Sequence, residues 1–315
     1  ILSGLVGSEM CIRDSPEILV IRERALGDVI LTTPIIQQLH TNHAGHCNID
    51  VHTAKPEAFS GNPHVRNTFG WTEFSRGWDA YDHVIDLDLA YEMRPSMHIT
   101  DAYAELAFGG GDRLLEKQPK LYSSERDAIV CDWIYRNLIG GEYAVIHMRY
   151  DSGMSRNLPQ DYWRSVVTKL LNHTNLKLVQ VGAATEHGFQ YGDRLVDLRG
   201  KLNLHELHGL IAKSRLYVGA DSGTLHVAAA TNVPIIAMFT SAHHDFRKPL
   251  GRNSDTSFYP LIPAVDCYGC QSRHTPPITR LICDRGDPND PPCTRRFDVA
   301  EFEVGLRQVL GSATH

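Results

Sequence analysis

The sequence predicts an α/β protein made of two halves, each with a parallel β-sheet covered by helices on both faces. Short apolar runs of strand length alternate with longer segments whose apolar residues recur at helical spacing. This alternation occurs on both sides of a glycine-, lysine- and proline-bearing stretch at residues 109–124, where we place the domain boundary. The chain has 315 residues, about twice a typical domain length. Two such halves leave a cleft between them, where ligands usually bind.

Composition excludes several classes of protein. The chain is 42% hydrophobic and 22% charged, which is ordinary for a globular protein with sizeable cores. Its net charge of −6 and isoelectric point near 6.3 argue against a nucleic-acid-binding protein, which would usually be basic. The longest apolar stretch, 227–240, is interrupted by Asn232 and Pro234 and is too short to span a membrane. Any membrane contact is therefore expected to be peripheral.

The amino terminus is treated separately from the fold. Residue 1 is Ile1 rather than an initiator methionine, and residues 1–15 are interpreted as a non-native tail that includes Cys11. This tail lacks the charged start and the unbroken apolar run of a secretory signal peptide. We therefore expect the protein to be cytoplasmic.

The first half, residues 16–120, is predicted to begin with a strand at 17–22 and a helix at 29–40. Asp28 then lies at a strand-to-helix junction, at the carboxyl end of a parallel strand. Further strands are predicted at 47–53 and 83–87, and a helix at 98–108 that ends at three glycines.

The second half, residues 121–296, repeats the pattern. Helices are predicted at 124–138, 159–171 and 203–213, with a short one after Glu186, and strands at 143–148, 176–181 and 195–198. Regular patterning stops after Thr240, and a long polar segment containing cysteines follows at 241–296. Such a segment in a compact domain is usually functional or fixed by a further interaction. A helix from about residue 297 to 310 opens the final section, 297–315.

Residues 216–238 (LYVGADSGTLHVAAATNVPIIAM) predict a strand, a tight turn, a helix and a second strand. The turn faces the ligand crevice in such units, and the helix amino terminus offers free N–H groups to anions. Ser222 is suited to cap the helix, and Gly223 leaves room for a phosphate beside the backbone. Asp221 and His226 would lie at the same opening. Alternatively, Asp221 and Ser222 only cap the helix and His226 packs in a half-polar core.

Three segments together carry a resemblance to a known family. They are ILVIRERALGDVILTTPIIQQL near the start, SRNLPQDYWRSVVTKL in the middle, and LYVGADSGTLHVAAATNVPIIAMF with its Asp-Ser-Gly-x-x-His pattern. In this order and spacing they resemble the lipopolysaccharide heptosyltransferases, glycosyltransferase family 9, over roughly residues 16–310. The resemblance implies a GT-B architecture of two Rossmann-like domains facing across a cleft. It also implies inverting transfer of heptose from ADP-heptose to a lipopolysaccharide core acceptor, with no catalytic metal.

The resemblance assigns roles to particular residues. Asp28 matches the family's proposed base, since an attacking acceptor hydroxyl must lose a proton to a nearby carboxylate. Its alternative is a helix N-cap. Arg156 stands where the family has a basic residue, commonly lysine, at the donor phosphates; its alternative is a surface arginine. The family places donor contacts on five further residues, Asp221, Ser222, Gly223, Thr224 and His226.

For other polar residues near the expected cleft, the sequence allows two interpretations of their role. His147 and Arg149 follow a strand of the second half, and His147 is either a cleft residue or a satisfied strand-end histidine. The loop 243–247 could close over a nucleotide, but a solvated polar loop is favoured. Arg24 either touches an acceptor acid group or pairs with Glu23.

Four cysteines gather late in the chain. Cys267 and Cys270 have the CxxC spacing of a metal clip, and Cys283 and Cys293 could complete a tetrahedral structural site for zinc or iron. Disulfides are disfavoured in the cytoplasm, so the alternative is reduced, unpaired thiols. The arrangement resembles an iron-binding finger of some family members that modify autotransporter proteins. Cys47 and Cys131 are interpreted as buried structural cysteines.

Three alternatives to heptose transfer onto lipopolysaccharide remain. One is a family 9 enzyme with another donor sugar or a protein acceptor. The second is a sugar-nucleotide-binding module without catalysis, against which the presence of Asp28 weighs. The third is a nucleotide-sugar epimerase, for which no acid–base pair can be identified in the sequence.

Overall fold

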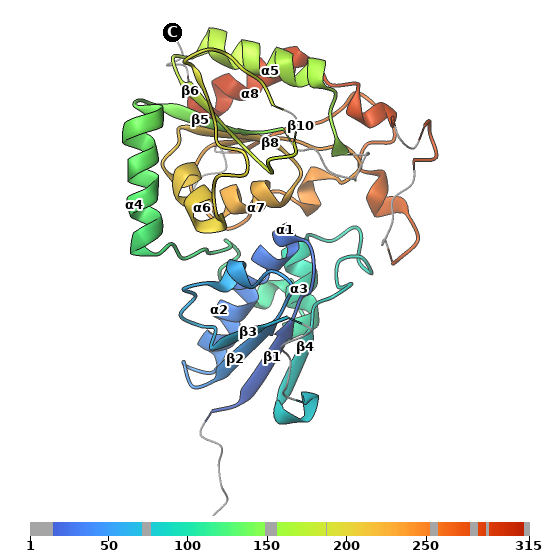
Figure 1. The fold of residues 1–315 in the computed structure, drawn as a ribbon. Helices are drawn as coiled ribbons and strands as arrows, with labels where there is room; N and C mark the ends of the chain where they lie inside the picture. Colours follow the sequence, from blue (N-terminus) through green and yellow to red (C-terminus); the bar gives the residue numbers. More distant parts are fainter. Residues whose placement is uncertain are drawn as a thin grey trace, which may run out of the picture.

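The computed structural model describes residues 15–70, 77–148, 156–186, 188–252, 258–277, 283–287 and 290–311. These residues form two parallel sheets, one above the other in Figure 1 and each with its own helices. The α/β class with two parallel-sheet domains is therefore confirmed. The predicted tail lies outside the described residues except for Ser15, and Arg149 lies outside them too.

The first sheet has four strands in the order β3-β2-β1-β4. Its strands are β1 (Glu17–Ile21), β2 (Asn48–His52), β3 (Asn67–Phe69) and β4 (His83–Asp86). Every neighbouring pair is parallel, with Ile18 beside Ile49 on one side and beside His83 on the other. The three-residue strand β3 was missed because NTF is too short to show an alternating pattern. Helix α3 (Ile99–Phe108) lies where the sequence predicts it and ends at Gly109, whose φ of 76° is left-handed.

The helix predicted at 29–40 is instead two helices, α1 (Leu26–Ile30) and α2 (Thr33–Asn42). Proline fits the first turn of a helix but not its interior, so the first helix ends before Pro34 and a second helix begins at Thr33. The hydroxyls of Thr32 and Thr33 donate to the carbonyls of Val29 and Ile30, which satisfies acceptors left by the break. Asp28 consequently lies inside the short helix α1, in its first turn.

The second sheet has six strands in the order β10-β9-β8-β5-β6-β7. They are β5 (Tyr143–His147), β6 (Lys177–Val181), β7 (Leu195–Asp197), β8 (Leu216–Ala220), β9 (Ile235–Met238) and β10 (Phe258–Leu261). The helices are α4 (Glu125–Ile134), continued by a π-helical turn at Tyr135–Ile139, then α5 (Gln160–His173), α6 (Leu204–Ala212), α7 (Gly223–Ala229) and α8 (Val299–Leu310).

Two expectations for this half are wrong. No helix follows Glu186 within the described residues 188–194, where Phe189 N–H instead bonds the Gln180 side chain and Gly192 has a left-handed φ of 53°. Strand β10 lies inside the segment that we expected to be irregular, and it pairs in parallel with β9. Its sequence, FYPL, carries a proline, which a strand tolerates at a sheet edge.

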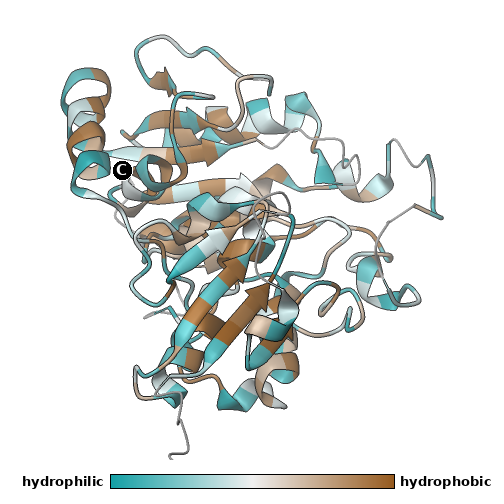
Figure 2. Cartoon of the chain, turned by 60° about the horizontal axis from the view of Figure 1, so that its bottom comes forward, coloured by the Kyte–Doolittle hydropathy of each residue, from teal (hydrophilic) through white to brown (hydrophobic). Residues whose placement is uncertain are grey.

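The strands of both sheets carry the core. Every residue of β5, β8 and β9 is buried, as expected for parallel strands covered on both faces. In Figure 2 the strands carry many hydrophobic residues, whereas the helices and loops around them carry both hydrophobic and hydrophilic residues. Among the described helices, none combines the length and the apolar composition that crossing a bilayer requires.

The two halves meet where α1 faces α7 (Figure 1). The imidazole of His98 in the first half donates from Nε2 to the Lys248 carbonyl of the second, at 2.9 Å. His205 of α6 donates from Nε2 to the Glu57 carbonyl of the first half, also at 2.9 Å. These bonds hold the carboxyl ends of β1 and β8 on opposite sides of one cleft.

Candidate active site between the two sheets

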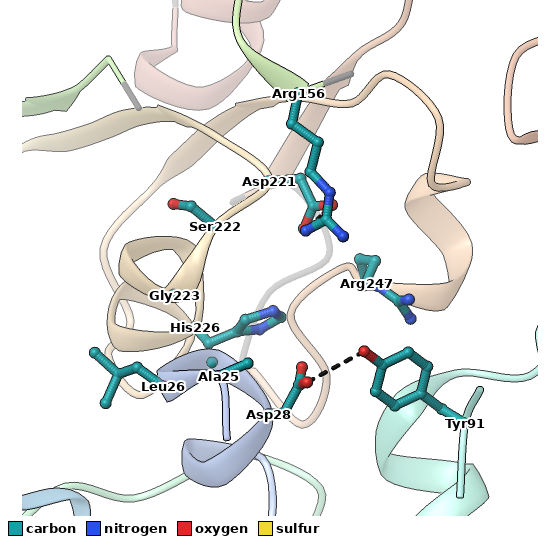
Figure 3. A pocket seen from close by; sticks show the side chains of 11 residues that line it. Ala25, Leu26, Asp28, Tyr91, Arg156, Asp221, Ser222, Gly223, His226 and Arg247 are labelled. Carbon is teal, nitrogen blue, oxygen red and sulfur yellow. Dashed lines mark hydrogen bonds and ion pairs between the residues drawn. The ribbon is translucent and has the colours of Figure 1, made fainter. Parts of the chain in front are cut away.

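A cavity of about 250 Å³ lies between α1 and α7. Residues from both halves contribute its walls, and the side chains of Asp28, Arg156 and His226 point toward a common space (Figure 3). It is lined by Ala25, Leu26, Gly27, Asp28 and Tyr91 from the first half and by Arg156, Asp221, Ser222, Gly223, His226 and Arg247 from the second. Six of the seven predicted catalytic and donor-binding residues are thus brought together. The seventh, Thr224, is half-buried on α7 but does not line the cavity.

Asp28 is held by two hydrogen bonds to the same oxygen. Its Oδ2 accepts from Nη2 of Arg22 at 2.6 Å and from the hydroxyl of Tyr91 at 3.1 Å. The N-cap of α1 is Ala25, with a left-handed φ of 62°, and the Asp28 side chain caps nothing. The alternative in which Asp28 is only a helix cap therefore does not describe this structure. The carboxylate instead lies at the floor of the cavity, opposite Arg156 and Arg247 (Figure 3).

Arg22 is the centre of a buried ionic cluster that sequence reasoning missed. Its guanidinium lies 2.6 Å from Asp28, 3.1 Å from Glu92 and 3.5 Å from Asp88. Burial opposes the charge of Arg22, but Tyr103 and the carboxylates of Asp28 and Glu92 outweigh it and raise the pKa further above its usual value. Arg22 therefore remains a cation. The sequence signal was its place directly after the buried strand β1.

Ser222 occupies the N-cap of α7, but its hydroxyl does not cap the helix, contrary to our expectation. The hydroxyl lies 3.2 Å from Nδ1 of His147, and Nε2 of His147 lies 3.4 Å from Glu186. Burial alone would raise the pKa of Glu186, but the bond from His147 keeps it below its usual value. His147 is thus a buried strand-end histidine with a partner on each ring nitrogen. It belongs to the wall behind Ser222.

Arg156 and Asp221 face each other across the upper part of the cavity, with Nη1 3.7 Å from Oδ2 (Figure 3). The Arg156 side chain is 32% exposed, and that of Asp221 only 5%. His226 is buried among these groups, and burial lowers its pKa despite the carboxylates of Asp221 and Asp28 nearby. The imidazole is therefore neutral at pH 7.

Two glycines allow the helices to approach. A Cβ atom added to Gly27 would lie 2.4 Å from Cδ2 of His226 and 3.2 Å from the Cα of Gly223. A Cβ added to Gly223 would meet the nitrogen of Gly27 at 3.4 Å, an ordinary contact. The close packing of α1 on α7 therefore depends on glycine at position 27.

The interpretation of the loop 243–247 as a solvated polar loop is wrong at Arg247. Arg247 is 6% exposed and lines the cavity, and its guanidinium lies 4.6 Å from the ring centroid of Tyr91 in the other half. No local pattern predicts this contact, because the two residues are far apart in the chain. Arg24 lies elsewhere: its side chain is 83% exposed and pairs with Glu23.

The late cysteines are close neighbours without disulfides. All four are described, and the neighbouring thiols help to raise the pKa of Cys270 and Cys293, after burial, which is the larger cause. Four sulfurs are a suitable donor set for zinc or iron. However, among the described residues the set with its ligand atoms within 4.8 Å of one another is His243, His244 and Asp245, which we did not predict. A metal at the cysteines would require the sulfurs to draw closer.

Comparison with known proteins identifies the family of the chain. The family model for glycosyltransferase family 9 (heptosyltransferase) matches residues 70–273. The chain belongs to this family. A curated family relative, lipopolysaccharide heptosyltransferase 3 of Escherichia coli, is 41% identical over 56 residues, which is 18% of this chain. That stretch covers 16% of the relative's length.

Solved structures are similar to this family 9 chain over nearly its whole length. The ADP-heptose lipopolysaccharide heptosyltransferase II of E. coli is 17% identical, with a TM-score of 0.65, covering 93% of this chain and 99% of that one. The iron-containing dodecameric glycosyltransferase TibC of enterotoxigenic E. coli is 15% identical, with a TM-score of 0.70, covering 94% and 76%. TibC has also been solved in complex with ADP-D-β-D-heptose. At these identities the likeness establishes the GT-B fold, which the sequence predicts.

Proposed function

We propose that the protein is an inverting glycosyltransferase that moves heptose from ADP-heptose to a lipopolysaccharide core acceptor. Family membership and the heptosyltransferase folds support the reaction class. The observation that carries the proposal is that Asp28 of the first half and Arg156 and Asp221 of the second line one cavity.

In the proposed reaction Asp28 is the general base. Its Oδ2 is engaged by Arg22 and Tyr91, and that engagement orients the other oxygen, Oδ1, for the acceptor hydroxyl. The hydroxyl loses its proton to Asp28 as it attacks the anomeric carbon from the face opposite the leaving group. A carboxylate within hydrogen-bond reach of the attacking atom is what this step requires.

The leaving nucleotide diphosphate gains negative charge as the glycosidic bond breaks. Arg156 and Arg247 line the same cavity and supply positive charge at that point. The resemblance to the family implies donor contacts at Ser222, Gly223, Thr224 and His226, and we include these contacts in the proposal. Neutral His226 can donate a hydrogen bond without neutralising Asp28. Two guanidinium groups thus perform the electrostatic work, with no metal at the reacting atoms.

The donor assignment rests on likeness: TibC was solved with ADP-D-β-D-heptose and the E. coli WaaC heptosyltransferase with ADP. It is tested by thermal-shift measurement against ADP-, UDP- and GDP-sugars, because a ligand that binds only the folded state stabilises it by mass action. We expect ADP-heptose to give the largest shift. A larger shift with a UDP- or GDP-sugar would contradict the donor while leaving the family intact.

The proposal also includes a structural metal held by Cys267, Cys270, Cys283 and Cys293. Bound there, zinc or iron would cross-link the segment 241–296 and take no part in the chemistry. The tetrathiolate donor set and the iron-containing relative TibC support this. The sulfurs would be the ligands, deprotonated on binding.

The role of Asp28 is tested by Asp28→Asn in a transfer assay. Loss of a general base commonly costs about 10²–10⁴ in rate, so turnover should fall by at least about a hundredfold while ADP affinity stays unchanged. Asp132→Asn, an exposed aspartate on α4 that pairs with Lys213, is the matched control and should retain activity. Full activity of the Asp28→Asn variant would refute the proposal.

A further inference from the structure

Glu92 and Asp28 bind the same nitrogen of Arg22. Nη2 donates to Asp28 Oδ2 at 2.6 Å and to Glu92 Oε1 at 3.1 Å, so the two acceptor oxygens lie less than about 6 Å apart. The side chains of Arg22, Asp28 and Glu92 are 6%, 12% and 11% exposed. At such burial solvent screens the charges weakly, so each carboxylate affects the other.

Glu92 is poorly arranged for a purely structural task. Its second oxygen, Oε2, is buried and accepts no hydrogen bond from any described residue. A buried carboxylate oxygen without a donor carries a desolvation penalty that no described contact offsets. An acidic side chain at such a position suggests that its contact with Arg22 is used.

The cluster carries more negative than positive charge. Arg22 is one cation among three carboxylates, with Asp88 at 3.5 Å and more exposed than the other two. Other groups facing Asp28 are the hydroxyls of Tyr91, which bonds its side chain, and Tyr103, which bonds its carbonyl. His226 and Arg247 line the cavity beside it. His226 is neutral, so the cations that line the cavity with Asp28 are Arg156 and Arg247.

We propose that Glu92 is a positioning residue that competes with Asp28 for the charge of Arg22 and thereby keeps Asp28 a strong base. A carboxylate paired alone with a buried arginine is stabilised in its ionised form and becomes a weak base. Because Glu92 shares the guanidinium, Arg22 still fixes the orientation of Asp28 but weakens it as a base less than an Arg22 paired with Asp28 alone would. The inference rests on the proposed role of Asp28 as the base.

The sign of the effect follows from this arrangement. Removing the charge of Glu92 leaves Arg22 more fully available to Asp28, so the Asp28 carboxylate is stabilised in its ionised form and becomes a weaker base. A weaker base also transfers the proton less readily, so kcat/KM on the plateau should drop about two- to tenfold.

The first readout is independent of activity. The Asp28 carboxyl carbon is titrated by ¹³C NMR in labelled protein, with its resonance assigned by its loss in Asp28→Asn. Glu92→Gln should move the Asp28 midpoint downward, whereas Glu92→Asp, which keeps the charge, should leave it within about 0.3 units of wild type. Asp88→Asn should move it in the same direction but less, because Asp88 is more exposed. An unmoved or raised midpoint in folded Glu92→Gln would overturn the inference.

The second readout is the pH profile of kcat/KM, whose acid limb reports ionisation of the base in the free enzyme. The acid limb should shift downward by the same amount as the NMR midpoint. Loss of activity with no shift would mean that Glu92 is only structural. If Asp28→Asn kept full transfer activity, the proposed function would fail, and the NMR titration would still decide the charge sharing.

Discussion

Arg247 reaches from the second half of the molecule to Tyr91 of the first, so a single side chain spans the cleft. It is buried, lies over an aromatic ring and lines the cavity together with Asp28. A planar guanidinium can stack on the ring and donate to an anion at the same time, which a lysine ammonium does less well. Its position suits an anionic group of either substrate.

We therefore predict that Arg247→Ala lowers kcat/KM for transfer by about 10–100-fold, because hydrogen bonds to charged groups contribute about 1.5–3 kcal/mol. Arg247→Lys should lie between this variant and wild type. Steady-state kinetics measure the effect, and Arg24→Ala, at an exposed arginine paired with Glu23, is the control that should remain near wild type. An Arg247→Ala enzyme with unchanged kcat/KM would remove Arg247 from the site.

Residues of the site were predictable where their signal is local. Asp28, Asp221 and His226 lie at or within one turn of a strand-to-helix junction, so the spacing in the chain places them near the carboxyl edges of the sheets. Arg22, Glu92 and Arg247 were missed because their roles depend on which distant side chain each one meets. Nothing in a stretch of sequence states that Arg247 packs on Tyr91.

At the scale of elements, α1 and α7 approach so closely that their contact has room for a glycine but not for the methyl group of an alanine. Gly27→Ala would place its Cβ 2.4 Å from the ring of His226, and one of the two helices would have to move. We predict that Gly27→Ala destabilises the fold by about 1–3 kcal/mol, as overpacking usually does. Urea unfolding measures this.

Gly223→Ala is the matched control for that prediction. Its added Cβ meets the nitrogen of Gly27 at an ordinary 3.4 Å, and alanine favours helix over glycine by roughly 0.5–1 kcal/mol. Gly223→Ala should therefore be neutral or slightly stabilising, opposite in sign to Gly27→Ala. Equal effects of the two changes would show that the packing of α1 on α7 does not depend on position 27.

The cysteine segment is attached to the loop that carries Arg247. Tyr268, between Cys267 and Cys270, accepts from the backbone N–H of His244 at 2.8 Å, and the Gln271 N–H bonds the Ser241 carbonyl at 3.0 Å. Stabilising the cysteine segment would therefore also stabilise residues 241–247.

If the proposed metal is bound, anaerobically purified protein should contain about one zinc or iron per chain, measured by elemental analysis. Cys293→Ser should lose the metal and become more sensitive to proteolysis within 241–296, since metal binding contributes directly to folding. Cys47→Ser, half-buried in the first half, should keep it. Absence of stoichiometric metal from the wild-type protein would leave these cysteines as free thiols.

Elements with several turns or strongly apolar runs were predictable to within a few residues, as β5, α3 and α8 illustrate. The failures have local causes. Pro34 divides one apparent helix into two, and β10 is recognisable only through its pairing with β9. A four-residue run containing proline does not reveal by itself that it completes a sheet.

At the scale of the whole molecule, the sequence predicts two halves but cannot say how they meet. The contacts between them are single, non-repeating bonds such as His98 to the Lys248 carbonyl and His205 to the Glu57 carbonyl. In His98 the Nδ1 atom also accepts from the Thr100 N–H at 3.1 Å, so Nε2 carries the proton that it donates across the junction. This histidine thus caps α3 and joins the halves only in its neutral form.

Burial lowers the pKa of His98 to about 4, from an ordinary value of 6.5. The unfolded chain therefore binds a proton at His98 before the folded one does, and stability is lost as pH falls from about 6.5 towards 4. At about 1.4 kcal/mol per pKa unit, this histidine alone accounts for a loss of about 3 kcal/mol by pH 4. Other buried histidines add to the same trend, so a variant must isolate this one.

His98→Asn keeps a residue that caps helices well but removes the titrating ring and the bond to Lys248. At pH 7 it should be less stable than wild type by about 1 kcal/mol, the usual contribution of a hydrogen bond. Between pH 6.5 and 4 its free energy of unfolding should fall less steeply, so that the two proteins converge and then exchange order. Urea unfolding at intervals across this range measures both curves, and a constant difference between them would show that His98 does not link the junction to pH.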